Sequence, residues 1–176
     1  CRPVTRVLAS SALLIYLLVT SIVVIAAEPD TPEPEAVAQK YYQQGVKYLR
    51  KYQLQRAERS YLKALEADPM HSPALASLAN LYSAQGRINE GLILVNKALK
   101  VEPENTDLWL KKGLLSRDLG KSVEAREAFF QAVELAPENP VVLRQVEDYL
   151  YQQNDLLQAK EVGMRRKMLE RGETQK

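Results

Sequence analysis

Few side chains in this sequence have the types and spacing that catalysis requires. The 176 residues include one histidine, His71, and one cysteine, Cys1. One histidine and one cysteine are too few ligands for a typical metal site. No acid or nucleophile has a spacing that would place it in a cleft with His71. The closest carboxylates on one predicted helix, Glu124 and Glu127, have the spacing of a solvated helix face. The seven glycines are scattered and form no phosphate-binding loop. The sequence therefore predicts no enzyme, no metal and no cofactor.

The balance of charge argues against a nucleic-acid-binding surface. The chain has 24 Lys and Arg residues against 22 Asp and Glu residues, a formal net charge of +2, whereas nucleic-acid-binding domains carry a concentrated basic face. Arg2 and Arg6 are the only charged residues before residue 28, so the remainder of the chain carries equal numbers of acids and bases. The positive excess lies in the N-terminal flank, residues 1–6.

Residues 7–27 contain no charged residue and are predominantly apolar. At about 1.5 Å per residue, a helix of this length spans about 31 Å, close to the hydrocarbon thickness of a bilayer. The apolar core of a secretory signal peptide is shorter, at about 7–15 residues, which favours an uncleaved transmembrane anchor. A cleaved signal peptide is the alternative, since the small residues Ala26 and Ala27 come directly before Glu28.

The residues that flank this segment predict its orientation. Arg2 and Arg6 precede it, whereas Glu28 and Asp30 follow it, and the next basic residue is Lys40. Because basic flanks stay on the cytoplasmic side, we expect a single-pass protein of the bacterial inner membrane. Its N-terminus would lie in the cytoplasm and the rest of the chain in the periplasm.

Cys1 suggests a second mode of membrane attachment. An N-terminal cysteine is typical of processed bacterial lipoproteins, so lipidation of Cys1 is one interpretation. A mature lipoprotein normally continues into a polar tether, whereas an apolar segment follows here. Removal of an initiator methionine, or a sequence that starts internally, is the alternative.

Residues 28–37 form a predicted linker. Three prolines and four acidic residues occur within residues 28–35, and this composition favours an extended spacer over helix or sheet. We expect a domain boundary here.

A period of 34 residues follows the linker. Pro69, Pro103 and Pro137 are 34 residues apart and close the similar phrases ALEADP, ALKVEP and AVELAP. They define three units, residues 38–71, 72–105 and 106–139. Positions 8, 20 and 27 of each unit are small, and positions 4 and 24 are larger. In unit order, the residues at positions 4, 8, 20, 24 and 27 are Tyr41, Gly45, Ala57, Tyr61 and Ala64, then Leu75, Ala79, Gly91, Val95 and Ala98, then Trp109, Gly113, Ala125, Phe129 and Ala132.

This pattern resembles the tetratricopeptide repeat (TPR) family. The resemblance implies an all-α solenoid of helix–turn–helix units, in which small residues let two helices approach and the proline ends the second helix. Residues 140–172 resemble a degenerate fourth unit, which we expect to form a capping pair before a tail at residues 173–176. Leu143, Val146 and Ala159 keep the pattern there, whereas Glu147, Gly163 and Arg166 depart from it.

The same resemblance implies a binding surface. In TPR arrays the first helices of the units line a groove for peptides, and positions 2, 5, 9 and 12 project into it. The groove residues carried over by position are Tyr42, Val46, Leu49, Asn80, Ser83, Leu110, Leu114, Arg117, Arg144 and Tyr151. An exposed apolar run flanked by polar groups is typical of a binding patch.

One ligand class of the family can be tested by position. TPR domains that bind chaperone tails use basic and amide residues as a carboxylate clamp. The clamp positions here hold Tyr42, Val46, Ser77, Asp107 and Lys111. Because only Lys111 fits, the sequence argues against that ligand class.

The expected function is therefore that of a membrane-anchored adaptor. Its groove would bind a segment of a partner protein during assembly of an envelope complex, with no nucleic acid and no small-molecule substrate. Two alternatives remain: a permanent structural subunit of a membrane, pilus or secretion complex, and a lipidated pilot protein of the outer membrane that depends on Cys1.

Overall fold

The structure, a computed structural model, describes residues 33–172. The predicted anchor (7–27), Cys1, the flank (1–6), the first part of the linker and the tail (173–176) lie outside the described residues. Eight α-helices and no strands occur within residues 33–172. They are α2 (Pro34–Arg50), α3 (Leu54–Ala67), α4 (Ser72–Ala84), α5 (Ile88–Val101), α6 (Thr106–Asp118), α7 (Ser122–Leu135), α8 (Pro140–Gln152) and α9 (Leu156–Glu170).

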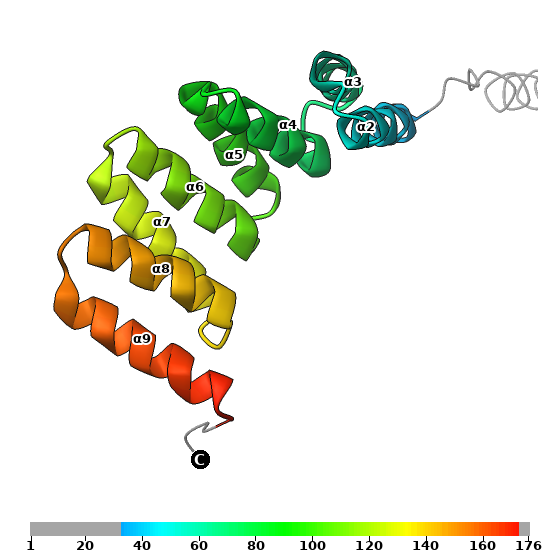
Figure 1. Ribbon diagram of the computed structural model, residues 1–176. Helices are drawn as coiled ribbons and strands as arrows, with labels where there is room; N and C mark the ends of the chain where they lie inside the picture. The colour runs from blue at the N-terminus through cyan, green and yellow to red at the C-terminus, as the bar shows by residue number, and fades with distance from the viewer. Residues whose placement is uncertain (1–32, 173–176) are drawn as a thin grey trace, which may run out of the picture. The chain divides into compact units, whose positions relative to one another are not determined.

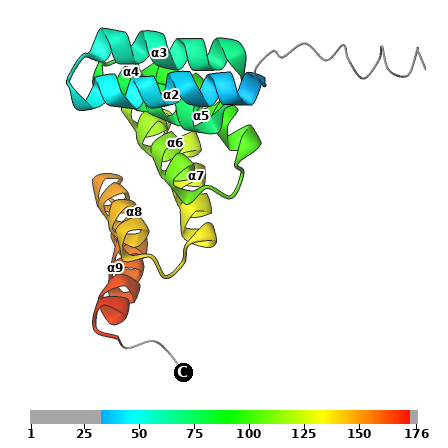
Figure 2. The ribbon, with the colours of Figure 1, turned by 90° about the vertical axis from the view of Figure 1, so that its right-hand side faces the viewer.

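The eight helices form four consecutive pairs, joined by short turns, in an all-α solenoid (Figure 1). Helices α4, α6 and α8 begin at Ser72, Thr106 and Pro140, the residues at which the second, third and fourth units start. The two helices of each pair lie side by side, as the second view also shows for α2 and α3 (Figure 2). Each unit of the sequence is thus one helical hairpin.

The first helix begins earlier than the sequence predicted. Helix α2 starts at Pro34, inside the expected linker of residues 28–37. Proline is tolerated in the first turn of a helix, where its missing N–H has no intrahelical partner and its fixed φ suits the helix. Glu35 adds a negative charge at the positive end of the helix dipole. The helix occupies residues 34–37 of the predicted linker, and the prediction of an extended spacer, made for residues 28–35, was wrong for Pro34 and Glu35.

One position at the end of each of the first three units caps the helix that follows. His71, Asn105 and Asn139 precede α4, α6 and α8, and each accepts a backbone N–H from the first turn with its side chain. For His71 the acceptor is Nδ1, 3.2 Å from the backbone nitrogen of Ala74. These contacts satisfy N–H groups that lack a partner within the helix.

The turn inside each hairpin also repeats its backbone geometry. The turn residues Tyr52, Gly86, Gly120 and Asn154 all have positive φ, of 56°, 77°, 72° and 60° respectively. Such a conformation is unfavourable for a residue with a Cβ atom, and glycine and asparagine adopt it most readily. Tyr52 is therefore the residue that fits this turn least well.

Buried residues of neighbouring units form a continuous series of core clusters. Ala57 and Tyr61 of α3 share one cluster with Leu78 and Leu81 of α4. Val95 of α5 shares the next with residues of α4 and α6, and a third joins α6 and α7 to α8 and α9. Since each unit buries its apolar face against the next, stability depends on the stack rather than on one hairpin.

None of the helices between residues 33 and 172 combines the length and apolar character needed to cross a membrane. The segment for which a span was predicted, residues 7–27, lies outside this range.

Candidate protein-binding surface

Within each hairpin the two helices approach closely at one glycine. Gly45 of α2 lies against the ring of Tyr61, and Gly113 of α6 lies against the ring of Phe129. A Cβ atom at Gly113 would lie 2.9 Å from that ring, which is closer than packed atoms come. These contacts fix α2 and α6 on α3 and α7, and so position the side chains that the first helices expose.

The other predicted packing residues follow the same scheme. Tyr61, Phe129, Leu75, Val95 and the alanines are at most 1% exposed. Tyr41 and Trp109 are half-buried, and Trp109 Nε1 donates a hydrogen bond to the Pro103 carbonyl at 2.7 Å. Pro69 and Pro103 are exposed in the turns between units, and Pro137 is half-buried. The fully buried alanines are Ala57, Ala64, Ala79, Ala98, Ala125 and Ala132, and Gly91 is buried with them.

The fourth hairpin reverses the sizes of the two contacting residues. Glu147 of α8 occupies the position of Gly45 and Gly113, and Gly163 of α9 occupies that of the aromatic rings. A Cβ atom at Gly163 would lie 2.8 Å from the Glu147 carboxyl carbon. Glu147 is 8% exposed, and its carboxylate accepts a hydrogen bond from Arg166 Nε at 2.9 Å. The departures from the repeat pattern thus compensate one another.

Arg166 connects this pair to the end of α9. Its Nη1 donates to both carboxylate oxygens of Glu170, at 2.9 and 3.0 Å. The bond to Glu147, and then that to Glu170, raises the pKa of Arg166. In turn, Arg166 holds the pKa of Glu170 below its ordinary value. Both pKa shifts are those expected of an ion pair, because an opposite charge nearby favours the charged form of each partner.

A second arginine joins the first two units. Arg87 Nη1 lies 2.8 Å from Glu58 Oε1 across the junction, and its Nη2 lies 2.6 Å from Glu90 Oε2. Its guanidinium carbon is 3.6 Å from the centroid of Tyr82. Hydrogen bonds to Glu90 and Glu58 raise the pKa of Arg87, and burial raises that of Tyr82, so the phenol stays neutral.

Four of the predicted groove residues are exposed on the first helices. Leu49 is 39% exposed and Tyr151 is 46% exposed. Asn80 and Arg144 are also exposed. They come from α2, α8, α4 and α8 respectively, so three of the four units present at least one of them.

Other predicted groove residues are only partly accessible. Tyr42, Val46, Ser83, Leu114 and Arg117 are half-buried. The ring of Tyr42 lies 6.0 Å from that of Tyr61 and 5.4 Å from that of His71, centroid to centroid. Arg117 Nη2 contacts Asp118 Oδ1 at 2.8 Å. The side chains of these residues are thus less accessible to a partner than those of the four exposed residues.

Leu110 was expected in the groove, and that prediction was wrong. It is 5% exposed and belongs to the core cluster that contains Phe129, Val142 and Val146. Its unit alone does not bury it, because Val142 and Val146 come from α8 of the next unit. A partner that binds the surface cannot contact its side chain extensively.

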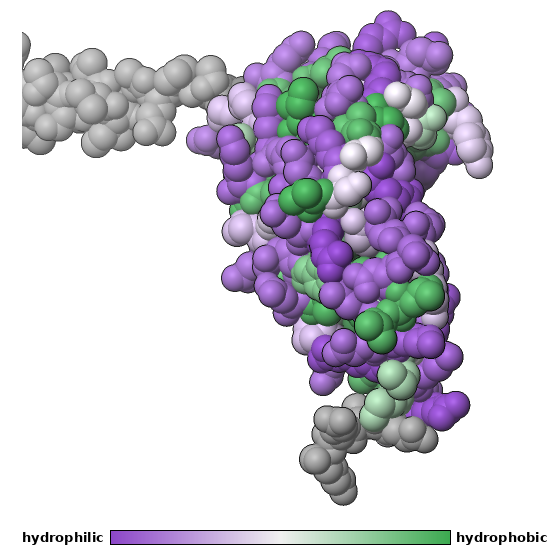
Figure 3. Space-filling view, turned by 90° about the vertical axis from the view of Figure 1, so that its left-hand side faces the viewer, coloured by the Kyte–Doolittle hydropathy of each residue, from purple (hydrophilic) through white to green (hydrophobic). Residues whose placement is uncertain are grey.

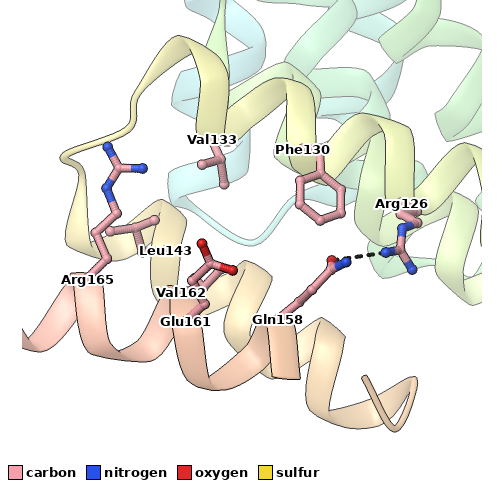
Figure 4. A pocket seen from close by; sticks show the side chains of 8 residues that line it. All are labelled: Arg126, Phe130, Val133, Leu143, Gln158, Glu161, Val162 and Arg165. Carbon is pink, nitrogen blue, oxygen red and sulfur yellow. Dashed lines mark hydrogen bonds between the residues drawn. The ribbon is translucent and has the colours of Figure 1, made fainter. Parts of the chain in front are cut away.

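A cavity that the sequence did not predict lies between α7 and α9. Its volume is about 390 Å³, and Phe130, Val133 and Val162 form its apolar wall. Figure 4 shows Arg126 at one end, where its Nη2 donates to Gln158 Oε1 at 2.9 Å. The cavity depends on residues 32 positions apart, which no local pattern could have indicated.

The remaining surface offers little that is typical of a catalytic or metal site. Hydrophilic residues dominate the face shown in Figure 3, with hydrophobic residues in small separate patches. Within residues 33–172, no three acidic, histidine or cysteine side chains gather in a way that would hold a metal ion. The exposed residues of the first helices, Leu49, Asn80, Arg144 and Tyr151, are the candidate binding site.

Known proteins match this chain in sequence. Residues 76–140 match a family model described as tetratricopeptide repeat. Protein NPGR2 of Arabidopsis thaliana is 33% identical over 109 residues, which cover 58% of this chain but only 15% of that protein. The chain spans 12 to 57% of the length of three other curated relatives.

Solved structures match the fold. A MamA structure, residues 41 to the end, from Desulfovibrio magneticus RS-1 has a TM-score of 0.71 at 20% identity, with 78% of each chain covered. The first TPR domain of Spaghetti (RPAP3), bound to the HSP90 peptide SRMEEVD, has a TM-score of 0.62 at 21% identity. That match covers 70% of this chain and 94% of the other. At these identities the likeness concerns the fold alone.

Proposed function

The chain belongs to the tetratricopeptide repeat family, and from this premise we propose that it is a membrane-anchored scaffold that binds a segment of a partner protein. The observation that carries the proposal is the set of exposed side chains on the first helices, Leu49, Asn80, Arg144 and Tyr151. They combine apolar surface, an amide and a cation on rigid helices, which suits recognition of a polypeptide segment.

Arg144 is the best candidate for an anionic contact. Its side chain is 63% exposed, and its Nη2 lies 3.5 Å from Glu170 Oε1, a long contact for an ion pair. A carboxylate of a partner would exchange for Glu170 at small cost, since exposed pairs contribute little. The HSP90 peptide of the RPAP3 structure is a precedent for a bound segment. The carboxylate-clamp positions of the family are not matched here, because Tyr42 and Val46 occupy two of them.

The proposal includes attachment at the bacterial inner membrane. Its support is the uncharged segment 7–27, with Arg2 and Arg6 before it and acidic residues after it. Tethering raises the effective concentration of a weakly binding groove near a membrane partner, which favours assembly of an envelope complex. Protease added to spheroplasts should digest residues 28–176. Complete protection of these residues would overturn the topology.

Site-specific photocrosslinking in cells that express the full chain tests the binding surface. A crosslinker at Asn80 should yield a defined protein adduct, and Leu49→Ala with Tyr151→Ala should reduce its yield several-fold. The matched control is Ile93→Ala with Val123→Ala, which removes exposed apolar side chains of α5 and α7. If both pairs of substitutions reduce the adduct yield equally, or if neither pair reduces it, the proposed site is wrong.

A further inference from the structure

The first hairpin carries an excess of positive charge that the later hairpins lack. Residues 34–71 contain seven Lys and Arg residues against four Asp and Glu residues, whereas the three later units are within one charge of balance. Of the four acids, Glu58 pairs with Arg87 of the next unit, and Asp68 accepts the backbone N–H of Met70. The acids of this hairpin are therefore too few to neutralise its seven cations.

Three of these cations form one face of α3. Arg56, Arg59 and Lys63 are spaced three and four residues apart, so they lie on the same side of the helix. All three are exposed. With Gln44 and Tyr48 of α2 they line a shallow hollow of about 240 Å³. We call this surface the basic face.

Tyrosine rings of α2 support the basic face. The Arg56 guanidinium carbon lies 5.8 Å from the centroid of Tyr48, and Lys63 Nζ lies 5.5 Å from that of Tyr41. Within residues 33–172, none of the three cations forms an ion pair with a carboxylate. Five of the seven arginines of the later units, by contrast, form ion pairs within residues 33–172. Cations held by rings but without counter-charges suit an anionic ligand.

The position of the first hairpin in the chain indicates which class of anion the basic face binds. The apolar segment ends at residue 27 and α2 begins at Pro34. The six residues between them span at most about 20 Å, even fully extended. If residues 7–27 cross a membrane, the first hairpin stays near the lipid headgroups, and the later units are not constrained in this way. Tyrosine side chains are also common at the boundary between headgroups and hydrocarbon.

We propose that the basic face of α2 and α3 binds the headgroups of anionic phospholipids. This inference rests on the membrane anchor of the proposed function and adds a second contact with the same membrane. Each basic residue near an anionic membrane surface strengthens the binding of the protein to that membrane about fivefold. The contact would fix the orientation of the repeat domain relative to the membrane, which a single anchor does not do.

Reconstitution of the full chain into vesicles tests this inference. The chain, with Cys1→Ser and Gln44→Cys, carries an environment-sensitive fluorophore beside the basic face. The vesicles contain phosphatidylcholine alone, or equal parts of phosphatidylcholine and phosphatidylglycerol. We expect headgroup contact, seen as a spectral shift, only with phosphatidylglycerol. Salt at about 1 M, where the Debye length is about 3 Å, should abolish it.

Charge reversal provides the matched control. Arg56→Glu, Arg59→Glu and Lys63→Glu together should remove the shift, whereas Lys97→Glu, Lys100→Glu and Lys160→Glu, on α5 and α9, should retain it. Equal loss with both triples, or no difference between the two lipid compositions, would overturn the inference. A crosslink from Arg59 to a protein in cells, without a lipid response in vesicles, would assign the face to an acidic polypeptide instead.

Failure of the anchor is distinguishable from failure of the basic face. Release of the chain from both vesicle types by alkaline carbonate would contradict the anchor in the proposed function. The basic face is then judged by peripheral binding. Sedimentation of the chain with phosphatidylglycerol vesicles alone would uphold it, and no sedimentation with either type would overturn it.

Discussion

Glu147 and Arg166 form a largely buried ion pair at the place where the first and third hairpins pack a glycine against an aromatic ring. The two atoms, Glu147 Oε2 and Arg166 Nε, are 2.9 Å apart, and the side chains are 11% and 16% exposed. Gly163 provides the space for the carboxylate. The last hairpin therefore depends on a charge contact that the others do not have.

Arg166→Met should lower the melting temperature of the repeat domain markedly. It leaves the Glu147 carboxylate buried without its cation, and an uncompensated buried charge is strongly unfavourable. Arg144→Met is the matched control, because Arg144 also contacts Glu170 but is exposed, and it should change the melting temperature little. Circular dichroism of the full chain in detergent measures both. Equal effects of the two substitutions would show that the pair with Glu147 is unimportant.

Tyr61→Phe should raise the free energy of unfolding by about 1 kcal/mol, because an unpaired buried hydroxyl is unfavourable. Tyr61 Oη is fully buried and makes no hydrogen bond of ordinary geometry within the described residues, although an interaction with the Ser77 side chain partly offsets the effect of burial on its pKa. Burial raises the pKa of this phenol, so it stays neutral. The corresponding residue of the third hairpin is already phenylalanine, Phe129. Urea unfolding measures the change, and a loss of stability would mean that the interaction with Ser77 outweighs the cost of burying the hydroxyl.

The spacing of small and large residues was sufficient to predict the hairpins, but not every residue's surroundings. Gly45 and Tyr61 meet within one unit, so their positions in the period imply their contact. Leu110 is buried by side chains of the next unit, and the cavity beside Phe130 likewise depends on how α7 and α9 are spaced. The sequence showed that Glu147 departs from the pattern, but only the structure shows that Gly163 leaves space for its carboxylate.

Tyr52→Gly should stabilise the first hairpin by about 0.5–1 kcal/mol. Relief of the left-handed backbone is worth about 1–2 kcal/mol, and the extra freedom of glycine in the unfolded chain offsets part of it. Tyr52 is 89% exposed, so little packing is lost. Gly86→Ala is the converse control, since Gly86 has φ of 77° and open space around it, and it should destabilise the second hairpin. If Tyr52→Gly destabilises the domain, the ring contributes contacts that outweigh backbone strain.

His71→Ala should reduce stability by about 1 kcal/mol more than His71→Asn does. The alanine removes the cap of α4, and asparagine provides the cap that α6 and α8 already use. Both substitutions lose the contact between His71 Nε2 and Gln39 Oε1, at 3.0 Å. The difference between them therefore isolates the cap. Thermal unfolding measures it, and identical losses would assign the role of His71 to the contact with Gln39.

Acid should weaken the junction between the second and third units through Glu102. Hydrogen bonds from Ser72 and Asn105 hold the pKa of Glu102 below its ordinary value of 4.5, and Asn105 Nδ2 lies 2.6 Å from Glu102 Oε2. Because the pKa is lower in the folded state, the carboxylate's contribution is fully present above pH 4.5. It is lost as the pH falls through the lower, folded-state pKa.

Glu102→Gln should therefore be less stable than the parent chain at about pH 7 and should lose less stability on acidification to about pH 3, because its side chain has no proton to gain. Urea midpoints at the two pH values give the comparison. Glu104→Gln is the control, since Glu104 is an exposed acid two residues away, and it should follow the parent chain. If Glu102→Gln and the parent lose stability in parallel, the acid sensitivity of the domain originates in other carboxylates.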